Sequence, residues 1–154
     1  MTDIGPVEKP KRGRPLSDAD QGFPIETTFF RALDGLALEC DGLTRVISTL
    51  LQRDGITHQV CVGSLTIPNK GAIPLHWWIV LSDGRICDFR AHMWLDDDQR
   101  VPHGVFSPEA HHQYEATHDV DPNSVALPSA IFSILTGKQV GDFPRLVDPS
   151  TLAA

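Results

Sequence analysis

Three side chains of this sequence are of the types that together perform thiol chemistry: Cys40, His76 and Asp88. A thiol attacks a carbonyl carbon well only as the thiolate, and a nearby imidazole or a helix N-terminus favours that form. The imidazole in turn needs a third group, commonly a carboxylate, that fixes its tautomer. This chemistry requires a cysteine at the start of a helix, a histidine facing it and a carboxylate beside the histidine.

The segment that carries Cys40 has a helical pattern, because apolar residues recur at spacings of three and four from residue 26 to residue 53. Gly35 and Gly42 interrupt it, each at a cost of about 1 kcal/mol relative to alanine in a helix interior. One long helix and two helices with a break near Cys40–Gly42 fit equally well. Only the break would place the thiol at a helix start. Gly55 is suited to end the second helix in the left-handed conformation.

Strand signals follow the helical segment. Residues 58–67 are rich in Val, Thr and Ile, and residues 76–82 and 85–90 flank a hairpin turn signal, Asp83-Gly84. Residues 99–128 are expected to be loop-rich with at most short strands. Residues 129–136 are expected to form a short helix that ends at glycine. The predicted fold class is α+β, with N-terminal helices packed on a small antiparallel sheet.

The length of the hairpin loop decides whether His76 and Asp88 can meet. A two-residue loop would put the two side chains on opposite faces of the hairpin, since a slip of one residue reverses the face. A three-residue loop at 82–84, with Gly84 left-handed, pairs Leu81 with Arg85. His76 then lies diagonal to Asp88 on one face, within reach of both side chains. The thiol hypothesis requires the three-residue loop.

Residues 38–95 resemble the transglutaminase-like and arylamine N-acetyltransferase branch of the papain-like cysteine fold. The shared order is Cys, an apolar helix, Gly-Ile, a strand, His-Trp, Asp-Gly and Asp. The resemblance implies a papain/transglutaminase-like core, with Cys40 as nucleophile, His76 as base and Asp88 as the orienting group. It implies a cysteine-dependent hydrolase or acyltransferase without a cofactor, acting on a protein, peptide or small amide or acyl substrate. Glu39 and Asp41 depart from the family pattern, and carboxylates beside a thiol oppose its ionisation.

Simpler interpretations of the same residues stay open. Cys40 would then be a core cysteine and His76 a cap on a strand edge, with Asp88 paired to Arg90 or Arg45 at the surface. Two further alternatives involve the remaining histidines. His103 is the best alternative base, and a zinc site is conceivable from the histidines at positions 92, 103 and 111 or 112.

A basic segment precedes the domain. Residues 1–24 are expected to be a disordered basic arm, and residues 25–154 a single papain/transglutaminase-like domain. Lys11, Arg12 and Arg14 lie in a stretch that looks like an AT-hook, whose arginines enter the narrow minor groove of A·T-rich DNA. The expected contact with such DNA is weak. The rival hypothesis is therefore a non-catalytic adaptor or DNA-associated protein that keeps the fold as a scaffold.

Composition limits the remaining classes. The chain has 154 residues, a net charge of −7 and three cysteines without a CxxC pair, which indicates one domain with free thiols. Residues 16–154 hold nine basic and eighteen acidic residues, so this part of the chain is a poor general binder of nucleic acid. No apolar run approaches the roughly 18 residues of a membrane span, and no secretory signal is recognisable. A cytoplasmic location without membrane contact is expected.

Overall fold

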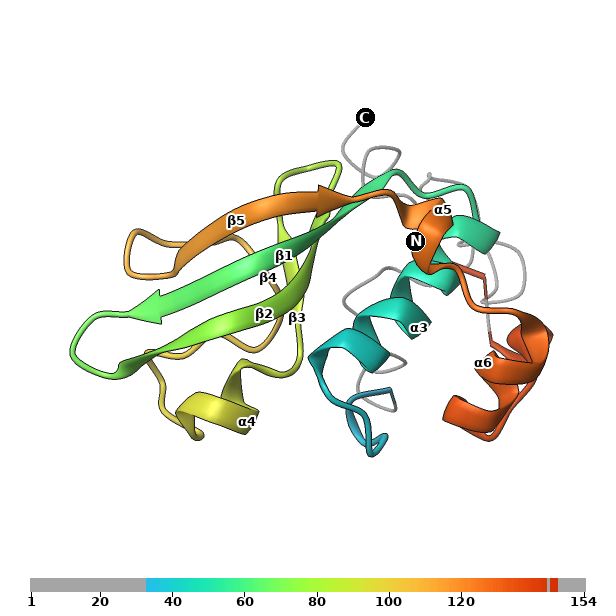
Figure 1. Ribbon diagram of the computed structural model, residues 1–154, viewed down its shortest axis with the longest axis horizontal. Helices are drawn as coiled ribbons and strands as arrows, with labels where there is room; N and C mark the ends of the chain where they lie inside the picture. Colours follow the sequence, from blue (N-terminus) through green and yellow to red (C-terminus); the bar gives the residue numbers. More distant parts are fainter. Residues whose placement is uncertain (1–32, 144, 147–154) are drawn as a thin grey trace, which may run out of the picture.

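The computed structural model describes residues 33–143 and 145–146, which form an α+β fold around one five-stranded antiparallel sheet of order β4-β3-β2-β1-β5 (Figure 1). The strands are β1 (His58–Ile67), β2 (Gly71–Leu81), β3 (Ile86–Asp88), β4 (Gly104–Phe106) and β5 (Gln113–Val120). The helices are α3 (Cys40–Arg53), α4 (Ala91–Leu95), α5 (Pro122–Val125) and α6 (Ser129–Thr136), followed by the 3-10 turn η1 (Val140–Asp142).

The α+β class and the antiparallel sheet are confirmed, but the expected placement of the helices before the sheet is wrong. Helix α4 lies between β3 and β4 in the chain, and α5 and α6 follow β5. The late helix α6 is needed because its buried Phe132 completes the core around α3. The expected arm, residues 1–24, lies outside the described residues, as do Lys11, Arg12 and Arg14.

Helix α3 begins at Cys40, as the two-helix interpretation requires. Glu39 is extended, with φ −81° and ψ −178°, and its carbonyl accepts the first helical bond from the Leu43 N–H at 2.9 Å. The helix stays in place because its apolar stripe is buried in the core. It ends before Gly55, whose φ of +69° is the left-handed conformation expected there.

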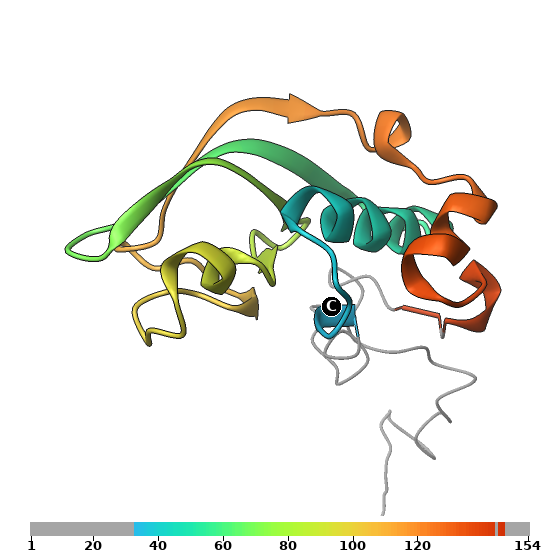
Figure 2. The same ribbon diagram turned by 60° about the horizontal axis from the view of Figure 1, so that its bottom comes forward.

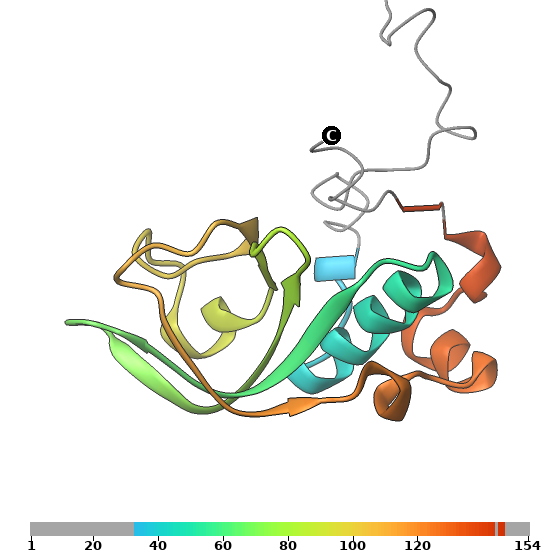
Figure 3. The ribbon, with the colours of Figure 1, turned by 90° about the horizontal axis from the view of Figure 1, so that it is seen from above.

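The sheet carries helices on both faces (Figure 3). Buried residues of β1, β2 and β3 pack on α3: Val60, Ile79, Leu81 and Cys87. Buried residues from the other end of β1 and β2 pack on α4: Leu65, Ile67 and Ile73. The long strands β1, β2 and β5 bend along their length (Figure 2). The opposite faces of one bent sheet therefore support the two helices.

The β2–β3 hairpin has the three-residue loop that the thiol hypothesis requires. Val80 pairs with Ile86, and the Leu81 N–H donates to the Arg85 carbonyl at 2.8 Å. Gly84 is left-handed, with φ +87°. Of the two registers that the sequence left open, the hairpin has the one that places His76 and Asp88 on one face.

Strand β5 was not expected, because residues 99–128 were assigned mostly to loops. Its sequence, QYEATHDV, has no buried residue, so no apolar alternation marks it as a strand. It is an edge strand that pairs with β1, where Gly63 faces its backbone. A Cβ atom at Gly63 would overlap the Glu115 carbonyl oxygen, so this close approach requires glycine.

Among the residues that the structure describes, no helix has the length and apolar character needed to cross a membrane.

Candidate functional site

The hairpin brings His76 and Asp88 together. His76 Nε2 lies 2.7 Å from Asp88 Oδ2, and the two residues are 0% and 3% exposed. The Trp78 ring stacks beside the imidazole with the ring centroids 6.1 Å apart. A pair that is buried in this way is held in one geometry, and the ring nitrogen facing the carboxylate is its donor.

Asp88 accepts two further hydrogen bonds. The Tyr114 hydroxyl donates to Oδ2 at 2.7 Å, and the Arg90 N–H donates to Oδ1 at 3.0 Å. Burial by itself would raise the pKa of Asp88, but the bond and charge of His76 and these two donors lower it. Burial and the neighbouring carboxylate raise the pKa of Tyr114, so the phenol stays protonated as a donor. Asp88 is thus held as an anion against the imidazole.

Cys40 lies near the His76–Asp88 pair, where the β2–β3 ladder has ended. The ladder stops at the pair Ile79–Cys87, so β3 does not cover β2 next to His76. The half-buried Cys40 lines a small cavity of about 10 Å³ together with Ile79, Cys87 and Asp88. Helix α3 packs on the sheet face of Ile79 and Cys87, whereas His76 and Trp78 lie on the other face. Cys40, the first residue of α3, is nevertheless near enough to His76 to raise the pKa of the imidazole.

The pKa of His76 reports how these groups act on the imidazole. Burial would lower the pKa, but the hydrogen bonds and charges of Asp88 and Cys40 outweigh it and raise the pKa from 6.5 to about 9. Within the described part of the chain, His76 Nδ1 has no hydrogen-bond partner of ordinary geometry. The Cys40 thiol is nevertheless near enough to raise the pKa of His76. With Nε2 bonded to the carboxylate, Nδ1 is the ring nitrogen available to the Cys40 thiol.

The other two cysteines are in different surroundings. Cys61 and Cys87 are buried in the core. Burial and Asp119 raise the pKa of Cys61 to about 11, and burial with Asp88 raises the pKa of Cys87 further. Both thiols are therefore held in the neutral, unreactive form.

Arg90 is a site residue that sequence reasoning missed. Its guanidinium makes five hydrogen bonds: to the carbonyls of Leu36, Leu38, Phe89 and Asp34, and to the Asp34 carboxylate. Its backbone N–H holds Asp88, so one residue ties the carboxylate to the segment that leads into Cys40. No sequence signal marks this arginine, which is only 6% exposed.

This role corrects the surface-pair interpretation. Asp88 is buried and bonds to the Arg90 backbone rather than to its guanidinium. The Arg45 guanidinium instead lies over the Trp77 ring, 5.5 Å from its centroid. His76 is likewise buried within the sheet and does not cap a strand edge.

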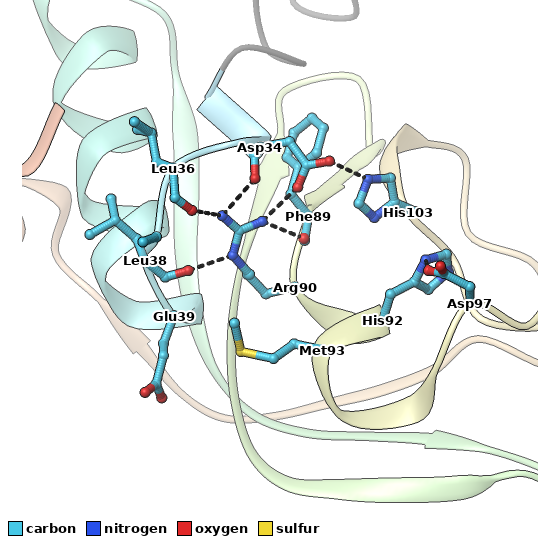
Figure 4. Close-up of a pocket in the computed structure, with 11 residues that line it drawn as sticks. Asp34, Leu36, Leu38, Glu39, Phe89, Arg90, His92, Met93, Asp97 and His103 are labelled. Atoms are coloured by element: carbon cyan, nitrogen blue, oxygen red, sulfur yellow. Dashed lines mark hydrogen bonds and ion pairs between the residues drawn. The ribbon is translucent and has the colours of Figure 1, made fainter. Parts of the chain in front are cut away.

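A groove of about 790 Å³ is lined by Glu39, the residue before Cys40 (Figure 4). One wall is the segment before the cysteine, and the other is the segment after β3. The lining residues are Asp34, Leu36, Ala37, Leu38, Glu39, Phe89, Arg90, His92, Met93, Asp97 and His103. Phe89 and Arg90 line both this groove and the small cavity at Cys40. The groove therefore adjoins the cavity that Cys40 lines.

The remaining histidines do not assemble a metal site. His103 Nε2 lies 2.9 Å from Asp34 Oδ2. The His103 ring stacks on the His92 ring, with the ring centroids 4.9 Å apart. His111 and His112 form a separate pair, 4.1 Å apart. Within residues 33–143 and 145–146, no group of three or more His, Cys, Asp or Glu side chains is arranged to hold a metal ion. His103 is bonded to Asp34 in the groove, so His76 is the better placed base.

No protein-family model, curated protein or solved structure matches this chain. The contacts of Cys40, His76 and Asp88 are therefore the basis on which a function can be assigned.

Proposed function

We propose that this protein is a cysteine-dependent hydrolase or acyltransferase that acts on an amide or acyl bond. Cys40 is the nucleophile, His76 the base and Asp88 the group that orients the imidazole. The observation that carries the proposal is the buried 2.7 Å bond from His76 Nε2 to Asp88, in a histidine whose pKa both Asp88 and Cys40 raise to about 9.

The first half of the reaction forms a thioester. A raised pKa favours the imidazolium, and the proton it holds comes from the Cys40 thiol, which leaves a thiolate beside it. The sulfur attacks the carbonyl carbon of the substrate and forms the S–C bond. The bond from that carbon to the leaving nitrogen or oxygen breaks, and His76 returns its proton to the leaving group.

The second half of the reaction releases the acyl group. Water or an acceptor amine gives a proton to His76 as it attacks the thioester carbon, and the proton then returns to the Cys40 sulfur as the S–C bond breaks. Water completes a hydrolysis and an amine completes a transfer. No oxidant, reductant or cofactor is needed for either outcome.

The start of α3 supplies donors for the charge that develops on the carbonyl oxygen. The first helical bond of α3 uses the Leu43 N–H, and the Glu39 side chain does not cap the preceding N–H groups. Amide groups at a helix N-terminus stabilise a developing oxyanion. Cys40 is the first residue of α3, so its thiol lies at the helix end where these amide groups are.

A papain/transglutaminase-like core is part of the same proposal. What supports it is the order of a helix that begins at cysteine, a neighbouring strand, and a hairpin with histidine and aspartate on one face. Expected substrates are a protein, a peptide or a small amide or acyl compound.

The test is the rate at which iodoacetamide labels each cysteine, measured by mass spectrometry between pH 5 and pH 9. At pH 6 we expect Cys40 to be labelled faster than the other two cysteines, because the imidazolium stabilises its thiolate. Cys61 and Cys87 should stay unlabelled in the folded protein. His76→Ala should remove most of the advantage of Cys40 at pH 6.

The matched control is His118→Ala, which removes an exposed histidine of β5 that bonds to Thr117 and should leave the labelling profile unchanged. If Cys40 labels no faster at pH 6 than an ordinary cysteine, or equally fast without His76, the thiol-enzyme proposal is wrong.

A further inference from the structure

The groove beside Cys40 has two kinds of wall. Leu36, Leu38 and Met93 give it apolar surface, and carboxylates at Asp34, Glu39 and Asp97 give it negative charge. Because it shares Phe89 and Arg90 with the small cavity that Cys40 lines, the part of a substrate near the reacting carbonyl would lie here.

The positive groups that line the groove are already engaged. The Arg90 guanidinium is used in five hydrogen bonds to the chain itself. His92 is bonded at both ring nitrogens, to the Asp97 carboxylate and the Val101 carbonyl. His103 is bonded through Nε2 to Asp34. An anionic ligand would therefore find few donors that are not already occupied.

Glu39 differs from the other carboxylates of the groove. Asp34 is paired with Arg90 and His103, and Asp97 is paired with His92. The Glu39 side chain is exposed and does not cap α3, and its carboxylate points away from Arg90 in Figure 4. It is also one residue from the nucleophile.

We infer that the groove selects substrates that carry a positively charged group, an amine or a guanidinium, on an aliphatic stem close to the reacting carbonyl, with Glu39 as the specificity-determining residue. The stem lies against the apolar wall and the cation lies at Glu39. This inference rests on the proposed thiol chemistry of Cys40 and names the class of substrate for it.

Methanethiosulfonate reagents of different charge test the inference without a known substrate. The thiolate attacks the reagent sulfur, a disulfide forms and methanesulfinate leaves, so the rate at Cys40 reports access through the groove. The reagents are the cationic trimethylammonium-ethyl, the anionic sulfonato-ethyl and the neutral methyl compounds, at pH 7.5 and 0.15 M salt. We expect the cationic reagent to react about 10-fold faster than the anionic one, and Glu39→Gln to reduce that ratio about 3-fold or more.

Asp41→Asn is the matched control, because Asp41 is also one residue from Cys40 and is exposed but does not line the groove. It should change the ratio by much less than Glu39→Gln does. A ratio near one in the wild type, or equal effects of the two variants, overturns the inference. The neutral reagent with His76→Ala separates this failure from a failure of the proposed function: a rate that still depends on His76 leaves the thiol chemistry standing and removes only the charge selectivity.

Discussion

Arg90→Lys is the substitution that most directly tests how the site is held together. Lysine keeps the positive charge but has one nitrogen, whereas the Arg90 guanidinium bonds to Asp34, Leu36, Leu38 and Phe89 through three. The variant therefore removes geometry rather than charge. The expected consequence is a loosened segment before Cys40 and a thiol that is no longer fixed opposite His76.

The size of the effect follows from the bonds that are lost. A hydrogen bond to a charged group contributes about 1.5–3 kcal/mol, and a lysine would keep one or two of the five. The loss of three bonds at the low end of this range is about 4.5 kcal/mol, and the Asp34 side chain is 32% exposed, so water replaces a small part of it. We expect the free energy of unfolding to fall by about 4 kcal/mol, which for a chain of this size corresponds to a decrease in Tm of about 8–16 °C.

Equilibrium unfolding in urea, followed by circular dichroism, measures the stability, and iodoacetamide labelling of Cys40 at pH 6 measures the site. The free energy of unfolding and the labelling rate of Cys40 should both fall in Arg90→Lys. Arg100→Lys is the matched control, since the Arg100 guanidinium is exposed and bonds to Asp98, two residues before it, and to the Asn69 carbonyl. A loss of less than about 1 kcal/mol in Arg90→Lys, or an equal loss in the control, would refute the assigned role.

Four further predictions follow from the same contacts. Asp88→Asn should lower the pKa of His76, because Asp88 supplies both a hydrogen bond and a charge that raise it; histidine NMR measures this. Tyr114→Phe removes one bond to the Asp88 carboxylate and should cost about 1.5–3 kcal/mol in urea unfolding while Cys40 stays reactive; a loss of Cys40 labelling would contradict it. Gly63→Ala should lower Tm, since its Cβ would overlap the Glu115 carbonyl, and an unchanged Tm would contradict the close approach of β5. Because the folded-state pKa of His76 is raised from 6.5 to about 9, its contribution to stability is complete below pH 6.5 and is lost as pH rises to about 9, a decrease of at most about 3 kcal/mol; a flat stability profile over this window would contradict it.

Local sequence signals marked the positions of the turn and of the helix start that the site depends on. The Asp83-Gly84 turn, with Gly84 left-handed, set the register that puts His76 and Asp88 on one face. Gly42 marked a break in the helical pattern, although the helix begins at Cys40 itself. These features depend on a few adjacent residues, so the sequence reduced each of them to two alternatives, and the structure decides between the alternatives.

The parts that the sequence did not predict depend on contacts between distant segments. The Arg90 guanidinium donates hydrogen bonds to the carbonyls of Leu36 and Leu38, more than fifty residues earlier in the chain, and no periodicity in the sequence reveals such partners. Strand β5 is stabilised by its pairing with β1 rather than by burial of its own side chains. The groove arises between residues 34–39 and 89–103, so its charge pattern exists only after folding.

The protonation state of His76 tests the central claim most directly, because the proposed chemistry needs an imidazolium held between Asp88 and Cys40. Nitrogen-15 NMR of histidine-labelled protein, titrated from pH 5 to pH 10 in the wild type and in Cys40→Ala, measures it. The expected pKa of His76 is about 9 in the wild type and lower in the variant, since the cysteine contributes to the increase. A pKa at or below 6.5 in the wild type, or no change in Cys40→Ala, would show that the thiol and the imidazole do not act as a pair.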